Sequence, residues 1–430
     1  MSHVLLLPYG TSGSTYPFIW LGRQLMAGGH RVTLVTAPRY ESIARQAGLN
    51  FVATGGEELE QMLKAPSLWK LGIGLATAYT HGGRAAKDYV AAAEEAIAQY
   101  GPADLLMAPM ICFGARVLRE KLRIPLVTVH LYPMMIIKAH LPPVVIPPFL
   151  WLRRLPLLLR RLILWFPNPL DLFAYPAVRR CCAEHGVTPH SLWKKWWDSP
   201  DGVLTLFPDW FAPPQPDWPK NLLQWDFPLE DMAAERPMDE ALARFLAEGE
   251  KPVLFTAGTG HFHAEAFFST AAKLVRELGC RAVFITPKTD QVPRDLPAGV
   301  FVSAYAPFSR LLPRARAFVH HGGIGTTSQC LAAGLPQFVV PMSLDQPDNA
   351  DRVKHLGVGL CISQGRFTVE RALPLLRRCL EDEKLRESAG EHASRLHDRP
   401  SPDVLLDWLE KRMRSTHPSR IPAAHTRDHP

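Results

Sequence analysis

The chain has 430 residues, of which 47% are hydrophobic and 21% are charged. This length and composition predict a globular protein of two domains and exclude a disordered chain. The formal net charge is +7 without any long run of Lys or Arg, which favours an anionic small ligand or a membrane surface over nucleic acid.

The first elements predict a parallel sheet. Residues 3–10 (HVLLLPYG) have the pattern of a buried strand that ends in a loop rich in Gly, Ser and Thr. A helical segment over 17–26 ends at Gly28-Gly29, and residues 31–37 (RVTLVTA) follow as a second strand. Such a βαβ unit implies parallel strands, and residues 103–109 and 125–131 read as later strands of the same sheet.

Residues 142–167, PPVVIPPFLWLRRLPLLLRRLILWFP, are apolar and basic. Arg153-Arg154 and Arg160-Arg161 are seven positions apart, so a basic stripe can lie opposite a broad apolar face, with a kink at Pro156. The pattern predicts a core helix packed over the N-terminal sheet. The alternatives are an apolar wall for an acceptor or a contact with a membrane surface.

The second half repeats the plan of the first. Apolar runs alternate with helical stretches, at residues 251–259, 280–287, 299–307, 315–321 and 336–342. We therefore expect an α/β fold of two doubly wound, Rossmann-like domains that face each other across a cleft. The predicted boundaries are an N-terminal domain over 1–215, a Pro-rich linker region over 216–250, a C-terminal domain over 251–400, and a helix and tail over 401–430 that pack back on the first domain.

Cysteines and termini suggest a cytoplasmic location. The seven cysteines have no CxxC or zinc-type spacing, so neither a disulfide framework nor a metal site is expected. The apolar run at the N-terminus is short and lacks a charged leader, and no uninterrupted apolar run has transmembrane length. A peripheral contact with the inner face of the membrane stays an alternative.

Residues 320–346, HHGGIGTTSQCLAAGLPQFVVPMSLDQ, carry the most informative pattern. Three loop glycines let the backbone approach a ligand, and Thr326 and Thr327 are good N-cap types for a helix over 327–333. The positive end of that helix, with His321 beside it, would form an anion site. The next strand would deliver Asp345 and Gln346, whose polar groups suit sugar hydroxyls. Together these features predict a nucleotide-sugar site.

This segment resembles the donor-binding signature of the family 1 glycosyltransferases of the GT-B fold. The resemblance extends to the glycine-rich first loop with Pro17-Phe18 and to the AYAP element at residues 304–307. Within the bacterial members, SPDGVLTLFPDWFAPPQPDWP and HLPPV are similar to the catalytic subunits of rhamnolipid-type rhamnosyltransferases. The N-terminal domain would then bind the acceptor and the C-terminal domain the donor.

The resemblance implies roles for individual residues. Tyr305 would stack on the nucleobase while the Ala306 backbone reads its edge. Gln329 replaces the Glu with which many uridine-diphosphate-dependent members hold the ribose, which favours the deoxyribose of a thymidine-diphosphate sugar. The sugar hydroxyls would be held by Asp345 and Gln346. The diphosphate would be held by Gly258, Thr259, His321, Gly323, Gly325 and Thr326.

Family 1 enzymes invert the anomeric centre, and the absence of a D-x-D triad predicts that no metal takes part. No cofactor is expected beyond a thymidine- or uridine-diphosphate sugar. The active-centre loop contains Thr11, Ser12 and Gly13, but the position of the usual general base holds Ser14, which cannot act as a base without an activator. A base from elsewhere, with His130 and His140 as candidates, an acceptor that arrives ionised, or dependence on a partner would explain this departure.

The predicted activity is transfer of a hexose, such as L-rhamnose or glucose, to a hydrophobic small-molecule or lipid acceptor. The alternatives are a transferase for a carboxylate or phenol aglycone and a non-catalytic helper subunit that binds sugar nucleotides. An NAD-dependent oxidoreductase is disfavoured because the first loop lacks GxGxxG spacing. The oligomeric state is not predicted.

Overall fold

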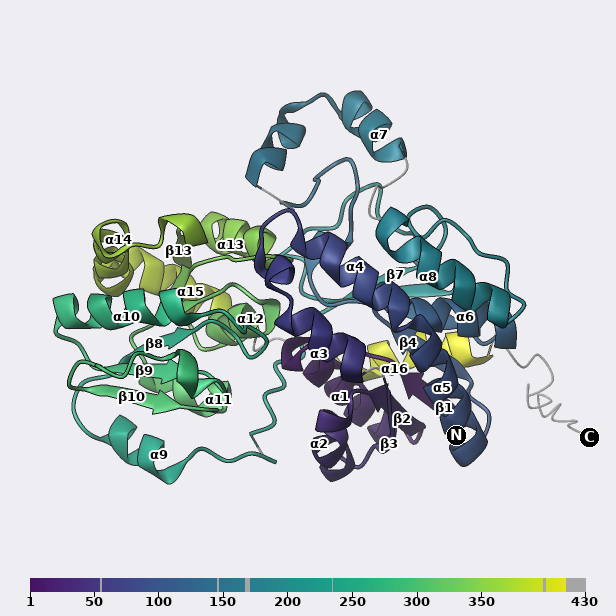
Figure 1. Ribbon diagram of the computed structural model, residues 1–430, viewed down its shortest axis with the longest axis horizontal. Coiled ribbons are helices and arrows are strands. Elements are labelled where there is room, and N and C mark those ends of the chain that lie inside the picture. Colours follow the sequence, from purple (N-terminus) through teal and green to yellow (C-terminus); the bar gives the residue numbers. More distant parts are fainter. Residues whose placement is uncertain (55, 145–146, 167–170, 234, 397–399, 415–430) are drawn as a thin grey trace, which may run out of the picture.

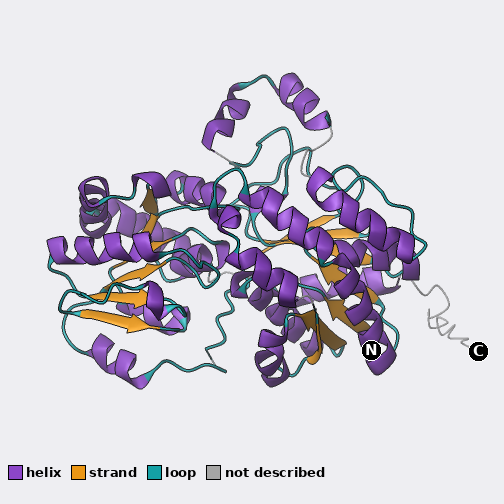
Figure 2. Cartoon of the chain, in the orientation of Figure 1, coloured by secondary structure: helices purple, strands orange, loops and turns teal. Residues whose placement is uncertain are grey.

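The computed structural model describes residues 1–54, 56–144, 147–166, 171–233, 235–396 and 400–414. The chain forms two parallel sheets, each with helices on both faces (Figures 1 and 2). This confirms the expected α/β class with two Rossmann-like domains. The predicted tail beyond residue 414 lies outside the described residues.

The first sheet has seven parallel strands in the order β3-β2-β1-β4-β5-β6-β7. Most of its strands are buried along their whole length, as expected of a sheet covered on both faces. The strands are β1 (His3–Leu6), β2 (Arg31–Thr36), β3 (Asn50–Ala53), β4 (Leu105–Ala108), β5 (Leu126–His130), β6 (Gly202–Leu206) and β7 (Leu222–Trp225). The sheet extends past residue 215, since β7 pairs with β6.

The helices of the first half connect and cover these strands. They are α1 (Ser12–Ala27), α2 (Glu41–Gln46), α3 (Gly56–Lys64), α4 (Gly74–Arg84), α5 (Ala86–Tyr100), α6 (Phe113–Leu122), α7 (Leu157–Trp165) and α8 (Asp171–Glu184). Helix α1 begins at Ser12, five residues before the predicted start at Pro17, so Pro17 lies inside the helix, where its nitrogen cannot donate an intrahelical hydrogen bond.

The second sheet has six parallel strands in the order β10-β9-β8-β11-β12-β13. Its strands are β8 (Val253–Thr256), β9 (Ala282–Ile285), β10 (Val300–Ser303), β11 (Ala317–His320), β12 (Gln337–Val339) and β13 (Gly359–Cys361). Its helices are α9 (Glu240–Ala247), α10 (Glu265–Leu278), α11 (Phe308–Leu311), α12 (Ile324–Ala332), α13 (Gln346–His355), α14 (Val369–Glu381) and α15 (Glu383–Arg395). Within the predicted linker, α9 inserts Leu242 into the core of this second sheet.

The last described helix, α16 (Pro402–Arg414), lies against the first domain. A Cβ atom at Gly202 of β6 would meet the Arg412 and Trp408 side chains, and one at Gly28 would meet Leu406. No helix within the described ranges is both long and apolar enough to cross a bilayer.

The predicted core helix over residues 142–167 is wrong. The segment forms a 3₁₀ helix, η4 (Pro147–Arg154), followed by α7, and Pro156 separates the two as the N-cap of α7. No residue of α7 is buried, and Figure 1 shows η4 and α7 standing away from both sheets. A proline at this point separates the two short helices and prevents one continuous helix.

Candidate active site

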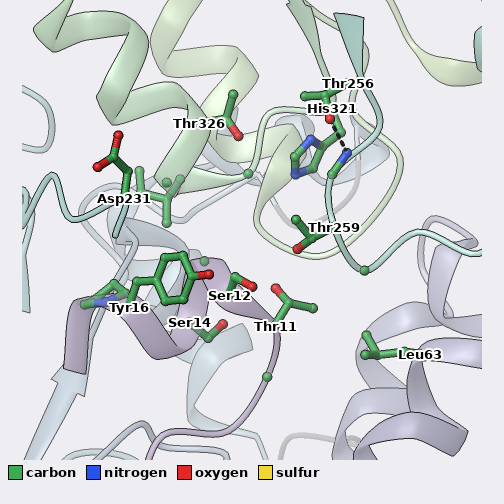
Figure 3. A pocket seen from close by; sticks show the side chains of 18 of the residues that line it. Thr11, Ser12, Ser14, Tyr16, Leu63, Asp231, Thr256, Thr259, His321 and Thr326 are labelled. Atoms are coloured by element: carbon green, nitrogen blue, oxygen red, sulfur yellow. Dashed lines mark hydrogen bonds between the residues drawn. The ribbon is translucent and has the colours of Figure 1, made fainter. Parts of the chain in front are cut away.

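A cavity of about 830 Å³ lies between the two domains. The loops that follow β1, β8, β10, β11 and β12 contribute to its wall, which places it at the carboxyl ends of both parallel sheets. Figure 3 shows Thr11, Ser12 and Ser14 of the first domain facing Thr259, His321 and Thr326 of the second. All of the predicted site residues line this cavity except the two candidate bases, His130 and His140.

The loop between β11 and α12 is held in shape by His320. Its buried ring accepts a hydrogen bond from Gly322 N–H at Nδ1 (3.1 Å) and contacts Gln337 Oε1 through Nε2 (3.0 Å). Gly322 has φ +87°, and a Cβ atom there would lie 2.7 Å from Val339. The loop therefore needs glycine at this position to turn back over the sheet.

Helix α12 begins earlier than predicted. Its N-cap is Gly323, whose carbonyl accepts from Thr327 N–H at 3.0 Å, so the prediction of Thr326 or Thr327 as cap is wrong. The His321 ring fills the space that a side chain at Gly323 would need. The first turn consequently presents its N–H groups beside Gly325 and Thr326, which line the cavity.

His321 packs between the two glycine-rich loops of the second domain. A Cβ atom at Gly258, which has φ +90°, would lie 2.7 Å from the His321 ring. Gly258 N–H donates to Thr256 Oγ1 at 3.1 Å (Figure 3). Burial lowers the pKa of His321 to about 4, so at neutral pH the imidazole offers a hydrogen bond but no positive charge.

Asp345 and Gln346 lie at the start of α13. Asp345 is the N-cap residue, and its Oδ2 accepts from Asn349 Nδ2 at 2.7 Å. Burial raises the pKa of the Asp345 carboxyl to about 7. Gln346 Oε1 accepts from the backbone N–H groups of Met342 and Ser343, at 2.8 and 3.0 Å. The side-chain oxygen of Gln346 is therefore already hydrogen-bonded, which leaves the side-chain NH₂ group to donate to a ligand.

Tyr305 is fixed at the other end of the cavity by the linker region. Its hydroxyl donates to the Asp231 carbonyl at 2.7 Å, and the Arg236 guanidinium lies 3.8 Å from its ring centroid. Ala306 and Gln329 are buried and line the same part of the wall. One face of the Tyr305 ring is thus covered by Arg236, an arrangement that no sequence pattern indicated.

The first domain supplies the active-centre loop and an apolar wall. Gly10, with φ +137°, packs against Ser14, since a Cβ atom there would lie 2.7 Å from Ser14 Oγ. The remaining wall of this domain is mainly apolar or aromatic. It includes Tyr9, Met62, Leu63, Leu68, Trp69, Leu75, Tyr79, Ile111, Tyr132 and Met135.

His130 and His140 are not brought to the cavity. The His130 side chain is fully buried behind β5, where Nε2 contacts Asp198 Oδ1 at 2.9 Å. Neither histidine is among the lining residues, and His321 is the one histidine that lines the cavity within the described part of the chain. The two candidates were chosen because they lie on either side of the loop after β5. Position along the chain does not determine whether a side chain faces the cavity.

Two cations that the sequence did not single out line the cavity near the active-centre loop. Arg39 follows β2, and its Nη2 donates to the Gly10 carbonyl at 3.4 Å. Lys288 follows β9, and its Nζ donates to the Thr259 carbonyl at 3.1 Å. Burial lowers the pKa of Lys288, and Arg39 adds to that effect. These two groups approach the cavity from opposite domains and favour an anionic ligand between them.

The two domains touch directly beside the cavity. The Trp69 ring stacks on His261 with centroids 4.3 Å apart. A Cβ atom at Gly260 would lie 2.6 Å from the Thr11 methyl group, and Ser343 Oγ donates to the Leu68 carbonyl at 2.6 Å. Among the described residues, no group of three or more His, Cys, Asp and Glu is placed to hold a metal ion.

Comparison with known families matches both halves of the chain. Residues 4–140 match the Glycosyltransferase family 28 N-terminal domain. Residues 278–411 match the "Erythromycin biosynthesis protein CIII-like, C-terminal domain". Together with the two-domain fold and the shared cavity, these matches indicate a glycosyltransferase of the GT-B fold.

Relatives in sequence and structure agree. The chain is 29% identical over 389 residues to O-mycaminosyltylonolide 6-deoxyallosyltransferase of Streptomyces fradiae, covering 87% of this chain and 86% of that protein. It is 28% identical over 367 residues to vancomycin aglycone glucosyltransferase of Amycolatopsis orientalis, covering 83% and 85%. The chain belongs to the family 1 GT-B glycosyltransferases and is a glycosyltransferase.

Solved structures share the fold. The glycosyltransferase of kitacinnamycin has a TM-score of 0.71 at 21% identity, with 96% of this chain and 99% of that chain covered. The glycosyltransferase VinC, solved in complex with dTDP, has a TM-score of 0.68 at 19% identity, with 96% and 100% covered.

Proposed function

We propose that the chain transfers a hexose from a thymidine- or uridine-diphosphate sugar to a hydrophobic small-molecule or lipid acceptor, with inversion at the anomeric carbon. The observation that carries the proposal is the single cavity in which an apolar wall from one domain meets a polar, N–H-rich wall from the other. Of the relatives reported above, one is named for O-mycaminosyltylonolide and the other for the vancomycin aglycone, which supports a small-molecule acceptor.

The polar wall suits a nucleoside diphosphate and its sugar. The N-terminal N–H groups of α12 stabilise a diphosphate, the His321 imidazole adds a neutral donor, and Lys288 lies beside Thr259 with a positive charge. The Asp345 carboxylate accepts from the sugar hydroxyls while the Gln346 amide donates to them. That VinC was solved with dTDP supports a thymidine nucleotide, as does Gln329 at the ribose position.

The reaction is then an in-line displacement. An acceptor oxygen attacks the anomeric carbon, the bond from that carbon to the diphosphate breaks, and the diphosphate leaves with the electron pair. The donors at α12 stabilise the charge that develops on the leaving group. Ser14 Oγ, in the first turn of α1 and in the cavity wall, orients the acceptor.

An acidic acceptor, such as a carboxylate or phenol, is favoured as a second candidate by the lining residues. The acceptor side of the cavity presents no histidine in the described part of the chain, while Arg39 stands next to the Ser14 loop. An acceptor that arrives ionised has no proton to lose and is attracted by this guanidinium.

The test is a turnover assay with thymidine- and uridine-diphosphate sugars as donors and a long-chain 3-hydroxy acid or a phenol as acceptor. The release of nucleoside diphosphate is measured. We expect acceptor-dependent release and a product of inverted configuration by NMR. Asp345→Ala should weaken binding of the sugar nucleotide but not of the free nucleoside diphosphate, and Ser14→Ala should cost less than about tenfold in kcat.

Binding of the sugar nucleotide without turnover of any acceptor would instead favour the helper-subunit alternative. An equal loss of donor and nucleoside diphosphate binding in Asp345→Ala would contradict the assigned division between the sugar and phosphate groups. A loss of several orders of magnitude in Ser14→Ala would assign Ser14 to proton transfer.

A further inference from the structure

The connection from β5 to the first turn of α8, here called the insertion, exposes many large apolar side chains. Of the fifteen exposed large hydrophobic residues in the described part of the chain, ten lie between Leu141 and Phe173. Leu158 is 76% exposed, Trp165 66% and Leu172 74%. Such a concentration of exposed apolar side chains in one segment marks a binding surface more often than an ordinary exterior.

Basic side chains lie on the same helical faces as these apolar ones. In η4 the exposed Arg154 follows Trp151 by three residues, which is one 3₁₀ turn. In α7 the exposed Arg161 lies between Leu158 and Trp165, three residues from one and four from the other.

The first turn of α8 continues the pattern. Leu172 and Phe173 are exposed there. The exposed Arg179 lies seven residues, or two turns, after Leu172, and the exposed Arg180 lies seven residues after Phe173. The three helical segments therefore carry apolar side chains beside guanidinium groups on shared faces.

The charge of the whole molecule is concentrated in this segment. Residues 141–180, which span this surface, hold six Arg and one Asp, a surplus of five out of the net +7 of the chain. The rest of the chain is therefore close to neutral. A second copy of the same surface would meet it with like charge, which disfavours self-association.

The insertion is fixed to the donor-binding domain. Arg153 Nη1 contacts Asp351 Oδ2 at 2.8 Å, and Val144 N–H donates to the buried Asp348 Oδ1, also at 2.8 Å. Both acids belong to α13, the helix that begins at Gln346. Any partner that binds the insertion therefore lies close to the cavity, because Gln346 at the start of α13 lines it.

We propose that η4, α7 and the start of α8 form a docking surface for an anionic lipid bilayer. The apolar side chains enter the headgroup region, the indoles of Trp151 and Trp165 lie at the interface, and Arg154, Arg161, Arg179 and Arg180 contact lipid phosphates. Apolar area and positive charge are the two signals that together give stable peripheral binding. The docking is independent of the donor chemistry proposed above.

Co-sedimentation of the full chain with phosphatidylcholine vesicles, with and without phosphatidylglycerol, tests this surface. We expect binding to the anionic vesicles that weakens with salt. Leu158→Ser/Leu162→Ser and Arg179→Glu/Arg180→Glu should each weaken it by about tenfold or more. The matched controls are Val404→Ser on α16, where Val404 is 52% exposed, and Arg371→Glu/Arg377→Glu on α14, and both should bind like the native chain.

Thermal unfolding of each variant checks that the fold is kept. Equal binding to both kinds of vesicle, no binding, or an equal loss in the control variants would overturn the proposal. A concentration-dependent dimer in sedimentation velocity that disappears in Leu158→Ser/Leu162→Ser would assign the surface to a second copy instead. Vesicle binding is measured without donor or acceptor, so its failure is distinct from a failure of the transferase activity.

Discussion

Asp345 illustrates how one side chain can couple pH to ligand binding. Its carboxyl lies in the cavity wall with one oxygen held by Asn349, and burial raises its pKa to about 7. In the empty site it is therefore largely protonated below neutral pH. A carboxyl that must accept from two sugar hydroxyls binds them better when ionised.

Affinity for the sugar nucleotide should consequently rise with pH and level off above about pH 7. Below that pH, binding releases a proton, and the dissociation constant increases by up to about tenfold per pH unit. Asp345→Asn should bind more weakly at pH 8 and lose this component of the pH profile. Titration calorimetry of both proteins from pH 5.5 to 8 measures it, and identical slopes would refute the assignment.

The identity of many cavity residues could be predicted from the sequence, because glycine-rich loops and an Asp-Gln pair have few structural uses in an α/β chain. Their partners could not. Asn349, which holds Asp345, and Arg236, which covers Tyr305, have no distinguishing pattern around them. His130 was misassigned because its pairing with Asp198 joins positions 68 residues apart, and such a contact depends on tertiary packing.

At the scale of elements, the loops after β8 and β11 act as one unit around His321. Gly258 lies in one loop and Gly323 in the other, and both leave room for the same imidazole ring. The ring fits in this position only because neither Gly258 nor Gly323 has a side chain. Any methyl group added on either side must displace it from the start of α12.

Gly258→Ala should therefore destabilise the protein by about 1–3 kcal/mol, since alanine is strained at φ +90° and its Cβ meets the His321 ring. It should also weaken nucleoside diphosphate binding. Gly365→Ala is the matched control, because nothing lies within 4 Å of a Cβ atom there. Urea unfolding and nucleotide titration compare the two, and an equally mild effect of both would contradict this account.

Most strands with long apolar runs were predicted, since burial on both faces of a parallel sheet imposes that composition. Strands β3, β6, β7 and β13 were not predicted. Three of them, β3, β7 and β13, lie at the edge of a sheet, whereas β6 is fully buried inside the first sheet. The apolar content of α7 indicated a core helix, but none of its residues is buried. Composition alone does not distinguish a buried apolar helix from an exposed one.

At the scale of the whole molecule, three histidines with lowered pKa values make the folded chain less stable in acid. Burial lowers the pKa of His261 and His320 to about 3 and that of His321 to about 4. Each is neutral in the folded chain and protonated in the unfolded chain below about pH 6.5, so stability is full above that pH and is lost as the pH falls. The raised pKa of Asp345 has the opposite effect and offsets part of the loss.

Near pH 5.5 the unfolded chain should bind about one to two more protons than the folded chain, and the free energy of unfolding should fall accordingly with decreasing pH. His261→Phe keeps a ring against Trp69 and should reduce this difference by about one proton. Urea unfolding at several pH values gives the slope. A flat profile between pH 5 and 7 would be incompatible with three neutral buried imidazoles.

The contact between Thr11 and Gly260 limits how closely the two domains can approach each other. The two lobes meet there with less space than one added carbon atom would need, and the Trp69–His261 stack lies nearby. The two domains therefore cannot approach more closely at this point unless the backbone of one of them moves.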